Sequence, residues 1–320
     1  MKQYSRVAAA IDLDAVAYNM EQMHKNIRKG TGMIAVVKTD AYGHGAVPIA
    51  EMMETYDYVW GYATATLDEA VLLRKNGIQK PILVLGCIFP DQFEEMIRYD
   101  IRMTVYQEAA MKEVSELAVS MGKKAYLHIK LETGMSRLGF APEKESVDAI
   151  LCIAGLPNLE VEGIFTHFAK ADETDKAYTF MQLETYHRMV SALERRGLSV
   201  PLHHCSNSAG IIDIPEANLD LVRAGIAIYG MYPSGEVDHK RVDLKPALSL
   251  VSHIEYVKTI PEGTCISYGG TFVAPHEMRV ATIPVGYGDG YPRSLSNKGC
   301  VLIHGKRAPI LGRVCMDQFI

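Results

Sequence analysis

The sequence lacks the features that mark a membrane, secreted or nucleic-acid-binding protein. It holds no apolar stretch long enough to span a bilayer, and the short apolar run at 7–11 ends at Asp12, well before signal-peptide length. The net charge of −5 gives no electrostatic reason to bind a polyanion, and the basic residues are scattered. We therefore expect a cytoplasmic protein that binds neither membrane nor nucleic acid.

Cysteine, proline and glycine are also too sparse to indicate a disulfide-rich, disordered or collagen-like protein. The six cysteines lie far apart without a Cys-x-x-Cys pair, so they predict neither a disulfide framework nor a metal site. The 14 prolines and 26 glycines are too few for a disordered or collagen-like chain. With 320 residues, 48% of them hydrophobic, the chain can form one large domain and a smaller one.

Short apolar runs alternate with longer stretches of helical period from residue 12 to about 230, the pattern of repeated βα units around a parallel sheet. Helices are predicted between the runs, for example at 13–28, 107–122 and 178–197. Eight strands over this length fit an α/β fold of the (β/α)8 (TIM) barrel type. The eight predicted strands are 33–38, 58–63, 82–85, 102–106, 125–131, 161–166, 203–206 and 219–229.

After residue 232 the pattern changes. Residues 233–246 resemble a linker, and the segments that follow lack long helical periods and are broken by turns, which favours a mainly β second domain. Strands are expected within 248–260, 279–285, 300–303 and 308–314. The predicted organisation is an N-terminal strand in 1–11 that packs with the β domain, a barrel over 12–240, and the β domain over 241–320.

Lys38 is the first candidate reactive residue. It follows a buried strand, and active sites of such barrels lie at the carboxyl ends of the strands. A partly desolvated lysine is the kind that forms Schiff bases with carbonyl compounds, although a lone lysine can also extend into solvent.

Residues 37–45, VKTDAYGHG, resemble the pyridoxal-phosphate lysine signature of the alanine racemase family. The resemblance implies the barrel and β domain described above, pyridoxal 5'-phosphate as cofactor, and interconversion of L- and D-alanine that supplies D-alanine for peptidoglycan. It covers essentially the whole chain. The further matching segments are 11–14 (IDLD), 133–139 (TGMSRLG), 165–169 (FTHFA), 206–209 (SNSA), 222–230 (VRAGIAIYG), 267–269 (SYG), 285–291 (VGYGDGY) and 312–317 (GRVCMD).

The resemblance implies two catalytic residues, one for each face of the substrate. Lys38 holds the cofactor and then moves the α-proton on one face, and Tyr268 serves the opposite face. Because a free phenol has a pKa of about 10, a tyrosine base needs cationic or hydrogen-bonding neighbours. His167 and Arg223 fit that role by resemblance.

The resemblance also implies the binding residues. Arg223 faces the pyridine nitrogen of the cofactor, and an arginine leaves that nitrogen largely unprotonated because it holds its own proton. Backbone amides and hydroxyl groups bind the phosphate. With Lys38 and His167, the implied cofactor-binding residues are Tyr42, Asn207, Ser208, Arg223, Gly225 and Ile226.

For the substrate, the resemblance implies that Arg137 holds the carboxylate through two hydrogen bonds, helped by the backbone amide of Met316. Lys130 matches a lysine that many relatives carry as a carbamate, and Asp317 supports the loop of Met316. In the family, Tyr268 and Met316 reach the active site of the other subunit. A homodimer with shared active sites is therefore expected.

Two departures leave alternatives open. The sequence ends at residue 320 inside an expected strand, so we expect the β domain to be incomplete at its C-terminus and to lack a tyrosine that helps to select the substrate side chain. Glu132 stands where relatives often have Asp, which resembles the serine/alanine racemase modules of glycopeptide-resistance systems.

Two other barrel classes are also considered. A decarboxylase would normally show a Gly-Gly-Gly phosphate loop and a cysteine-aspartate pair near its end, and neither occurs in this sequence. A non-catalytic pyridoxal-phosphate-binding barrel lacks a second domain, so the β segments after 248 favour the enzyme.

Overall fold

The protein is described by a computed structural model over residues 6–320, which form two compact units. One unit is Asp12–Ala247, and the other combines Leu248–Ile320 with the N-terminal segment that ends at Ile11. The first five residues of the predicted N-terminal strand segment lie outside the described residues.

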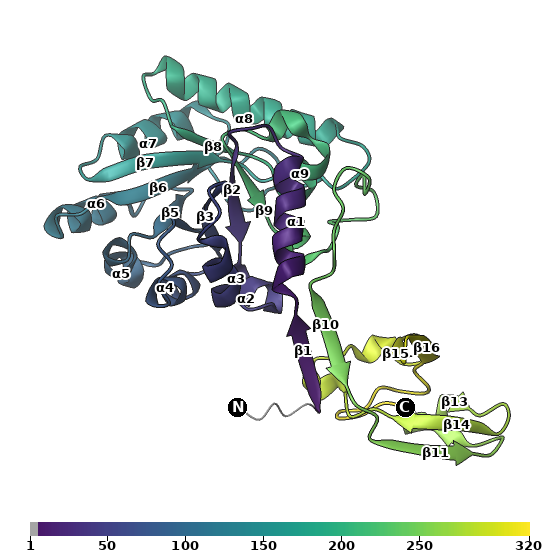
Figure 1. The fold of residues 1–320 in the computed structure, drawn as a ribbon. Helices are drawn as coiled ribbons and strands as arrows, with labels where there is room; N and C mark the ends of the chain where they lie inside the picture. Colours follow the sequence, from purple (N-terminus) through teal and green to yellow (C-terminus); the bar gives the residue numbers. More distant parts are fainter. Residues whose placement is uncertain (1–5) are drawn as a thin grey trace. The chain divides into compact units, whose positions relative to one another are not determined.

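Eight parallel strands form the sheet of the unit Asp12–Ala247, and the predicted barrel is confirmed (Figure 1). Their order is β8-β7-β6-β5-β4-β3-β2-β9, and the Arg223 N–H of β9 donates to the Ser206 carbonyl just after β8, which brings the two ends of the sheet together. The strands are β2 (Gly32–Val36), β3 (Val59–Thr64), β4 (Ile82–Val84), β5 (Arg102–Val105), β6 (Ala125–Lys130), β7 (Leu159–Phe165), β8 (Leu202–His204) and β9 (Leu221–Ala224).

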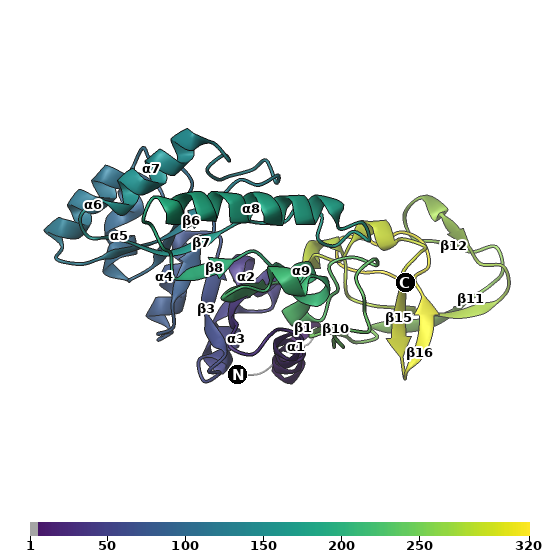
Figure 2. The same cartoon turned by 90° about the horizontal axis from the view of Figure 1, so that it is seen from above.

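Helices cover the outside of this sheet, and α7 and α8 lie side by side along it (Figure 2). Local signals start them: the Asp12 carboxylate caps α1 by accepting from the Ala15 N–H at 3.0 Å, and Thr66 with Glu69 forms a capping box on α4. The helices are α1 (Leu13–Lys25), α2 (Lys38–Gly43), α3 (Ala46–Met53), α4 (Leu67–Lys75), α5 (Phe93–Arg98), α6 (Met111–Ser120), α7 (Lys144–Ala154), α8 (Ala177–Arg195) and α9 (Ser208–Asp213), with short 3-10 turns η1 (Pro90–Gln92), η2 (Pro215–Ala217) and η3 (Ile226–Tyr229).

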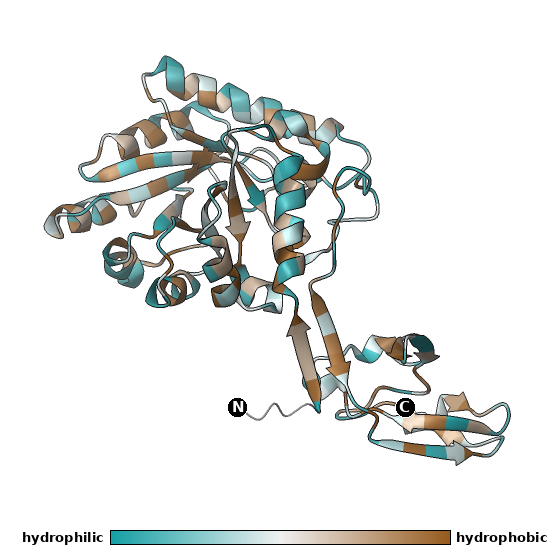
Figure 3. Ribbon diagram, viewed as in Figure 1, coloured by the Kyte–Doolittle hydropathy of each residue, from teal (hydrophilic) through white to brown (hydrophobic). Residues whose placement is uncertain are grey.

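The strands of the barrel are apolar because helices cover one face and the barrel interior covers the other. All residues of β4 and β9 are buried, and the hydropathy colouring shows polar residues concentrated on the outer faces of the helices (Figure 3). No helix within residues 6–320 is both long enough and apolar enough to cross a bilayer.

The prediction of one continuous strand over 219–229 is wrong in its second half. Strand β9 ends at Ala224, and Gly225 takes φ −113° and ψ −112°, a conformation outside the strand region. The apolar residues that follow are largely buried, but they form the 3-10 turn η3. Burial explains their composition, and the glycine explains where the strand stops.

The other unit is built from antiparallel pairs of short strands, as predicted for a mainly β domain. The predicted segment 248–260 is two strands in different sheets, and only the first two residues of 308–314 are in a strand. The pairs are β1 (Val7–Ile11) with β10 (Leu248–Ser252), β11 (Tyr256–Ile260) with β14 (Met278–Thr282), β12 (Cys265–Ile266) with β13 (Phe272–Val273), and β15 (Cys300–Ile303) with β16 (Lys306–Pro309); the 3-10 turns are η4 (Tyr268–Gly270), η5 (Tyr287–Asp289) and η6 (Arg293–Leu295).

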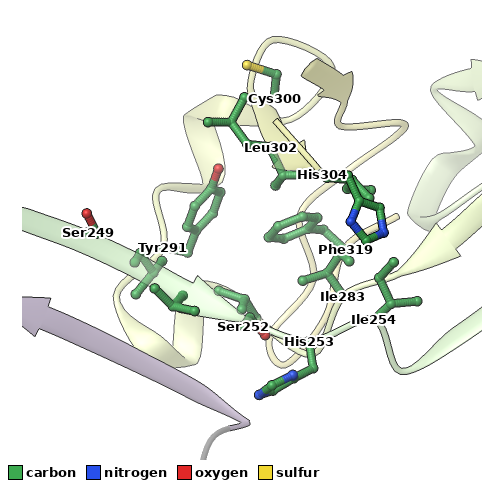
Figure 4. A pocket seen from close by; sticks show the side chains of 15 residues that line it. Ser249, Ser252, His253, Ile254, Ile283, Tyr291, Cys300, Leu302, His304 and Phe319 are labelled. Atoms are coloured by element: carbon green, nitrogen blue, oxygen red, sulfur yellow. The ribbon is translucent and has the colours of Figure 1, made fainter. Parts of the chain in front are cut away.

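A cavity of about 760 Å³ lies inside this β unit (Figure 4). Residues of β10 and β15 line it together with Tyr291 and Phe319, whose ring centres are 5.1 Å apart. Its titratable side chains include the histidines His253 and His304 and the thiol of Cys300. The cavity holds none of the predicted site residues.

Gly163 in β7 gives room for a buried imidazole of the neighbouring strand. A Cβ at this position would lie 2.3 Å from Nδ1 of His128, which is fully buried. We expect Gly163→Ala to lower the free energy of unfolding by about 1–3 kcal/mol, because the ring has no space to move away. Urea denaturation measures this, with Gly235→Ala as control, since a Cβ at Gly235 meets no atom within 4 Å. Equal stability of the two variants would contradict the packing.

Candidate active site

Lys38 follows β2 at the carboxyl end of the barrel strands. Its side chain is half-buried, and its amine donates to no acceptor within residues 6–320. The next four residues, from Thr39 to Tyr42, have φ between 51° and 56° and form a left-handed turn. Such backbone costs roughly 1–2 kcal/mol for each L residue, so neighbouring groups must stabilise it.

Two carboxylates hold the left-handed turn in place. The Thr39 N–H donates to Oε1 of Glu69 at 2.6 Å, and the Ala46 N–H donates to Oδ1 of Asp40 at 2.8 Å. The other oxygen of Glu69 accepts from the Ala65 N–H at 2.7 Å. Glu69 therefore ties the residue after Lys38 to the start of α4.

The left-handed turn brings Tyr42 to the end of β9. A Cβ built on Gly225 would lie 3.4 Å from the Tyr42 hydroxyl and 3.7 Å from Oγ of Ser208, so both hydroxyls lie next to a residue without a side chain. Oγ of Ser208 accepts from the Gly225 N–H at 3.0 Å. The Tyr42 hydroxyl has no hydrogen-bond partner among the described residues, and burial raises its pKa.

Two further predicted residues lie beside these hydroxyls. Ile226 begins η3 directly after Gly225. Asn207 precedes α9, and its side-chain oxygen accepts from the Gly210 N–H at 3.0 Å. Asn207 thus caps the helix that carries Ser208.

Arg223 in β9 is buried, and protein atoms accept from both of its terminal nitrogens. Nη1 donates to the carbonyl and to Nδ1 of His204, at 2.9 and 2.8 Å, and Nη2 donates to the Thr166 and Cys205 carbonyls, at 2.7 and 2.8 Å. Burial lowers the Arg223 pKa to about 10. Nε has no acceptor within residues 6–320. It is therefore the one guanidinium nitrogen without a hydrogen-bond partner among these residues.

His167 lies among the predicted cations. Nη2 of Arg223 is 3.3 Å from its Nδ1. Burial, followed by the charges of Arg223, Lys130, Arg137 and Lys38, lowers the His167 pKa well below the ordinary value. These four cations therefore lie near one imidazole, and together with burial they favour its neutral form.

The loop after β6 carries Arg137 and is organised by Glu132. The Glu132 carboxylate accepts from the Gly134 N–H and from the Arg137 N–H, the latter at 3.2 Å. The Tyr178 hydroxyl of α8 donates to the Gly134 carbonyl at 2.7 Å. The Arg137 side chain is exposed and pairs with no carboxylate among the described residues.

Lys130 ends β6 in a buried position. Its amine donates to the Leu131 carbonyl at 3.0 Å and lies 5.3 Å from the ring centre of Phe165. Burial, then the charge of Arg223, lowers the Lys130 pKa to about 7. A large fraction of this amine is therefore neutral near pH 7 and able to react as a nucleophile.

The remaining predicted residues lie in the β unit, where they share one open depression of about 640 Å³. Tyr268, Met316 and Asp317 all line it, and the Tyr268 side chain is 70% exposed. The Met316 carbonyl accepts from the Gly288 N–H at 2.8 Å, while its own N–H has no acceptor within residues 6–320. Tyr268 and Met316 are thus both exposed residues of this unit.

Three polar residues of the barrel were not singled out by the sequence analysis: His128, Glu162 and His204. They connect Arg223 to the interior of the barrel through hydrogen bonds. A signal existed in the sequence, because each is a titratable residue within a run predicted to be a buried apolar strand.

Family models for two domains match almost the whole chain. The model for the alanine racemase N-terminal domain matches residues 11–233, and the model for the alanine racemase C-terminal domain matches residues 247–320. The chain belongs to the alanine racemase family.

Individual relatives agree with this family membership. An alanine racemase of Clostridium tetani is 48% identical over 318 residues, covering 99% of this chain and 82% of that protein. The alanine racemase of Clostridium difficile 630 superposes with a TM-score of 0.94 at 40% identity, covering 99% and 83% of the two chains. Its complex with cycloserine gives a TM-score of 0.92 at 39% identity, covering 99% and 82%. This alanine racemase family member is an isomerase.

Proposed function

We propose that the chain interconverts L- and D-alanine with pyridoxal 5'-phosphate as cofactor, and that the reaction supplies D-alanine for peptidoglycan. The observation that carries the proposal is Arg223: a buried cation with both terminal nitrogens hydrogen-bonded and one free Nε–H, at the same end of the barrel as Lys38. The family membership and the names of the relatives support the substrate.

The residues present fit this cofactor. Lys38 supplies the amine for its aldehyde, and the hydroxyls of Tyr42 and Ser208 with the backbone at Gly225 and Ile226 supply donors for its phosphate. Asn207 holds the helix of Ser208 in place. When bound, pyridoxal phosphate makes the Cα–H of an amino acid acidic by withdrawing electrons.

Arg223 would set how strongly the ring of a bound pyridoxal phosphate withdraws electrons. A guanidinium keeps its proton near neutral pH even when burial lowers its pKa to about 10. Its Nε can therefore donate a hydrogen bond to the ring nitrogen without transferring a proton. We infer that this limits the lifetime of negative charge on Cα and disfavours side reactions such as transamination.

Racemisation needs a proton acceptor and a proton donor on opposite faces of Cα. We assign one face to the amine of Lys38 and the other to the hydroxyl of Tyr268 of the partner subunit. Nδ1 of His167 faces the Arg223 donor Nη2, so a neutral His167 carries its proton on Nε2 and can donate a hydrogen bond to the phenol oxygen. The exposed Tyr268 favours delivery to a second copy of the chain.

The substrate carboxylate is assigned to Arg137 and to the backbone N–H of the partner subunit's Met316, with Asp317 beside it in the same depression. The proposed assembly is a homodimer in which the barrel, residues 12–240, of one copy and the β domain, residues 241–320, of the other form each active site. Monomers are expected to be inactive.

The test starts from pure L-alanine and, separately, from pure D-alanine, with the folded chain and added pyridoxal phosphate. We expect both reactions to converge on equal amounts of the two enantiomers, measured by chiral chromatography, and cycloserine to inhibit them. Conversion of serine at a comparable kcat/KM would instead favour a serine/alanine racemase. Cofactor binding without any conversion would favour the non-catalytic alternative.

Lys130 supports a further prediction. The neutral fraction of its amine can attack carbon dioxide, forming an N–C bond and releasing one proton, and the resulting carbamate would attract Arg137 instead of repelling it. We expect a carbamate resonance in the 13C NMR spectrum of the protein with 13C-bicarbonate, lost in Lys130→Ala and on acidification. A spectrum without that resonance at pH 7–8 would show that Lys130 remains an amine.

A further inference from the structure

A continuous chain of hydrogen bonds connects Arg223 with a carboxylate inside the barrel. Nη1 of Arg223 is 2.8 Å from Nδ1 of His204, and Nε2 of His204 is 2.9 Å from Nδ1 of His128. Nε2 of His128 is 3.2 Å from Oε2 of Glu162, which also accepts from Nε of Arg102 at 3.0 Å. Four neighbouring or facing strands, β9, β8, β6 and β7, supply the four groups from Arg223 to Glu162.

The direction of every hydrogen bond in this chain is determined by its two ends. A guanidinium has only donors, so Nδ1 of His204 must be unprotonated and its proton must be on Nε2. His204 then donates to Nδ1 of His128, whose proton must also be on Nε2, and His128 donates to Glu162. An ionised carboxylate has only acceptors, so both ends require the same pair of tautomers.

The surroundings keep both histidines neutral and the carboxylate charged. Both imidazoles are fully buried, and burial is the main cause that lowers the pKa of each. Arg102 holds both oxygens of Glu162, through Nε to Oε2 and through Nη2 to Oε1 at 3.2 Å. Hydrogen bonds from His128 and Arg102 lower the Glu162 pKa to about 2 despite its burial.

Ring packing fixes the two imidazoles in the required orientation. His204 stacks on Phe165 with 4.6 Å between ring centres and 7° between planes. His128 lies against Gly163, where any side chain would displace it. Packing therefore fixes the plane of the His204 ring and the space for the His128 ring, and the hydrogen bonds determine which nitrogen faces which partner.

We propose that Glu162, His128 and His204 are positioning residues that lock Arg223 in a single orientation, with its Nε–H directed at the ring nitrogen of the cofactor. The proposal rests on the proposed function for the direction of Nε, whereas the locked tautomers follow from the hydrogen bonds alone. If Glu162 did not accept, His204 could move its proton to Nδ1, where it would face the Nη1 donor of Arg223 and displace the guanidinium.

Two double variants differ in whether position 162 offers His128 an acceptor; the glutamine amide also has donors, but the Arg223 end of the chain still favours a protonated Nε2 on His128. Arg102→Met/Glu162→Gln keeps an acceptor, and Arg102→Met/Glu162→Leu removes it; both lack the cation, so no charge is left unpaired. Glu160→Gln, on the same strand and paired with Lys124 at 2.6 Å, is the control for loss of a carboxylate. Circular dichroism checks that all three variants fold.

The first readout is 15N NMR of histidine-labelled protein without cofactor, with signals assigned by His128→Phe and His204→Phe. We expect both histidines of the wild type and of the glutamine variant to have a protonated Nε2 and an unprotonated Nδ1, and the leucine variant to show mixed tautomers. The same tautomers in both double variants, or an Nδ1–H form in the wild type, would overturn the proposal.

The second readout is racemisation with cofactor. We expect kcat of the leucine variant to fall by about 10- to 100-fold with a smaller change in KM, and the glutamine variant to stay close to the control. Equal kcat values for the two double variants would overturn the positioning role. Locked tautomers in a folded chain that racemises nothing would instead contradict the proposed function.

Discussion

Replacing Lys38 by alanine is expected to remove both the covalent attachment of pyridoxal phosphate and the racemase activity. The half-buried Lys38 side chain lies just after β2. The left-handed turn begins at the next residue, at the carboxyl end of the barrel strands. Its loss removes the nucleophile for the cofactor and one of the two bases, so we expect activity to fall by at least about 10³-fold.

The measurement compares visible absorbance and racemisation of Lys38→Ala with those of Lys29→Ala. Lys29 is an exposed lysine that precedes β2, at the opposite end of the same strand. The control should keep the cofactor absorbance band and the activity. Retention of the band in Lys38→Ala would show that another amine binds the cofactor.

Tyr268→Phe is expected to give the second large effect, and an asymmetric one. If the hydroxyl serves only one face of Cα, its loss slows proton removal from one enantiomer by about 10²- to 10⁴-fold and leaves removal from the other much less affected. The equilibrium constant between mirror images is one, so kcat/KM of racemisation must fall equally in both directions. The asymmetry is therefore visible in exchange of the α-proton with solvent.

Incubation of each enantiomer in deuterium oxide, followed by mass spectrometry of unreacted alanine, measures this exchange. Tyr256→Phe is the control, because Tyr256 is an exposed tyrosine of the same β unit outside the depression of Tyr268. Similar, modest losses of exchange from both enantiomers would indicate a packing role for Tyr268. A rate of exchange per chain that rises with chain concentration would further support a site shared between two copies.

Much of the barrel was predictable because its strands must be apolar on both faces. The run before Lys38 and the run that contains Arg223 both showed this pattern, which placed these two residues at neighbouring strands β2 and β9. The end of β9 was less predictable. Ile226 and its apolar neighbours are buried in the η3 turn as they would be in a strand, so composition alone does not separate the two.

The left-handed turn after Lys38 could not be read from local propensities. Four consecutive L residues adopt positive φ there, and part of their stabilisation comes from Glu69, about 30 residues away in the chain, which accepts from the Thr39 N–H. The position of the Tyr42 hydroxyl beside Gly225 depends on that turn. A long-range hydrogen bond, not a sequence pattern, therefore sets this part of the site.

The hydrogen-bonded chain behind Arg223 was missed for a related reason. His128 and Glu162 come from β6 and β7, and strand register places His128 opposite Gly163, while Phe165 lies opposite His204. Each polar residue alone is an exception within an apolar run. Only the arrangement of the strands in the barrel shows that these polar residues are hydrogen-bonded to one another.

Reductive trapping identifies the residue that binds the cofactor. The folded chain is mixed with pyridoxal phosphate and treated with borohydride, which reduces a C=N bond to a stable amine, and the modified residue is mapped by mass spectrometry. We predict one adduct, on Lys38. An adduct on a different lysine, or none in a chain that circular dichroism shows to be folded, would contradict the assignment of Lys38 as the residue that binds the cofactor.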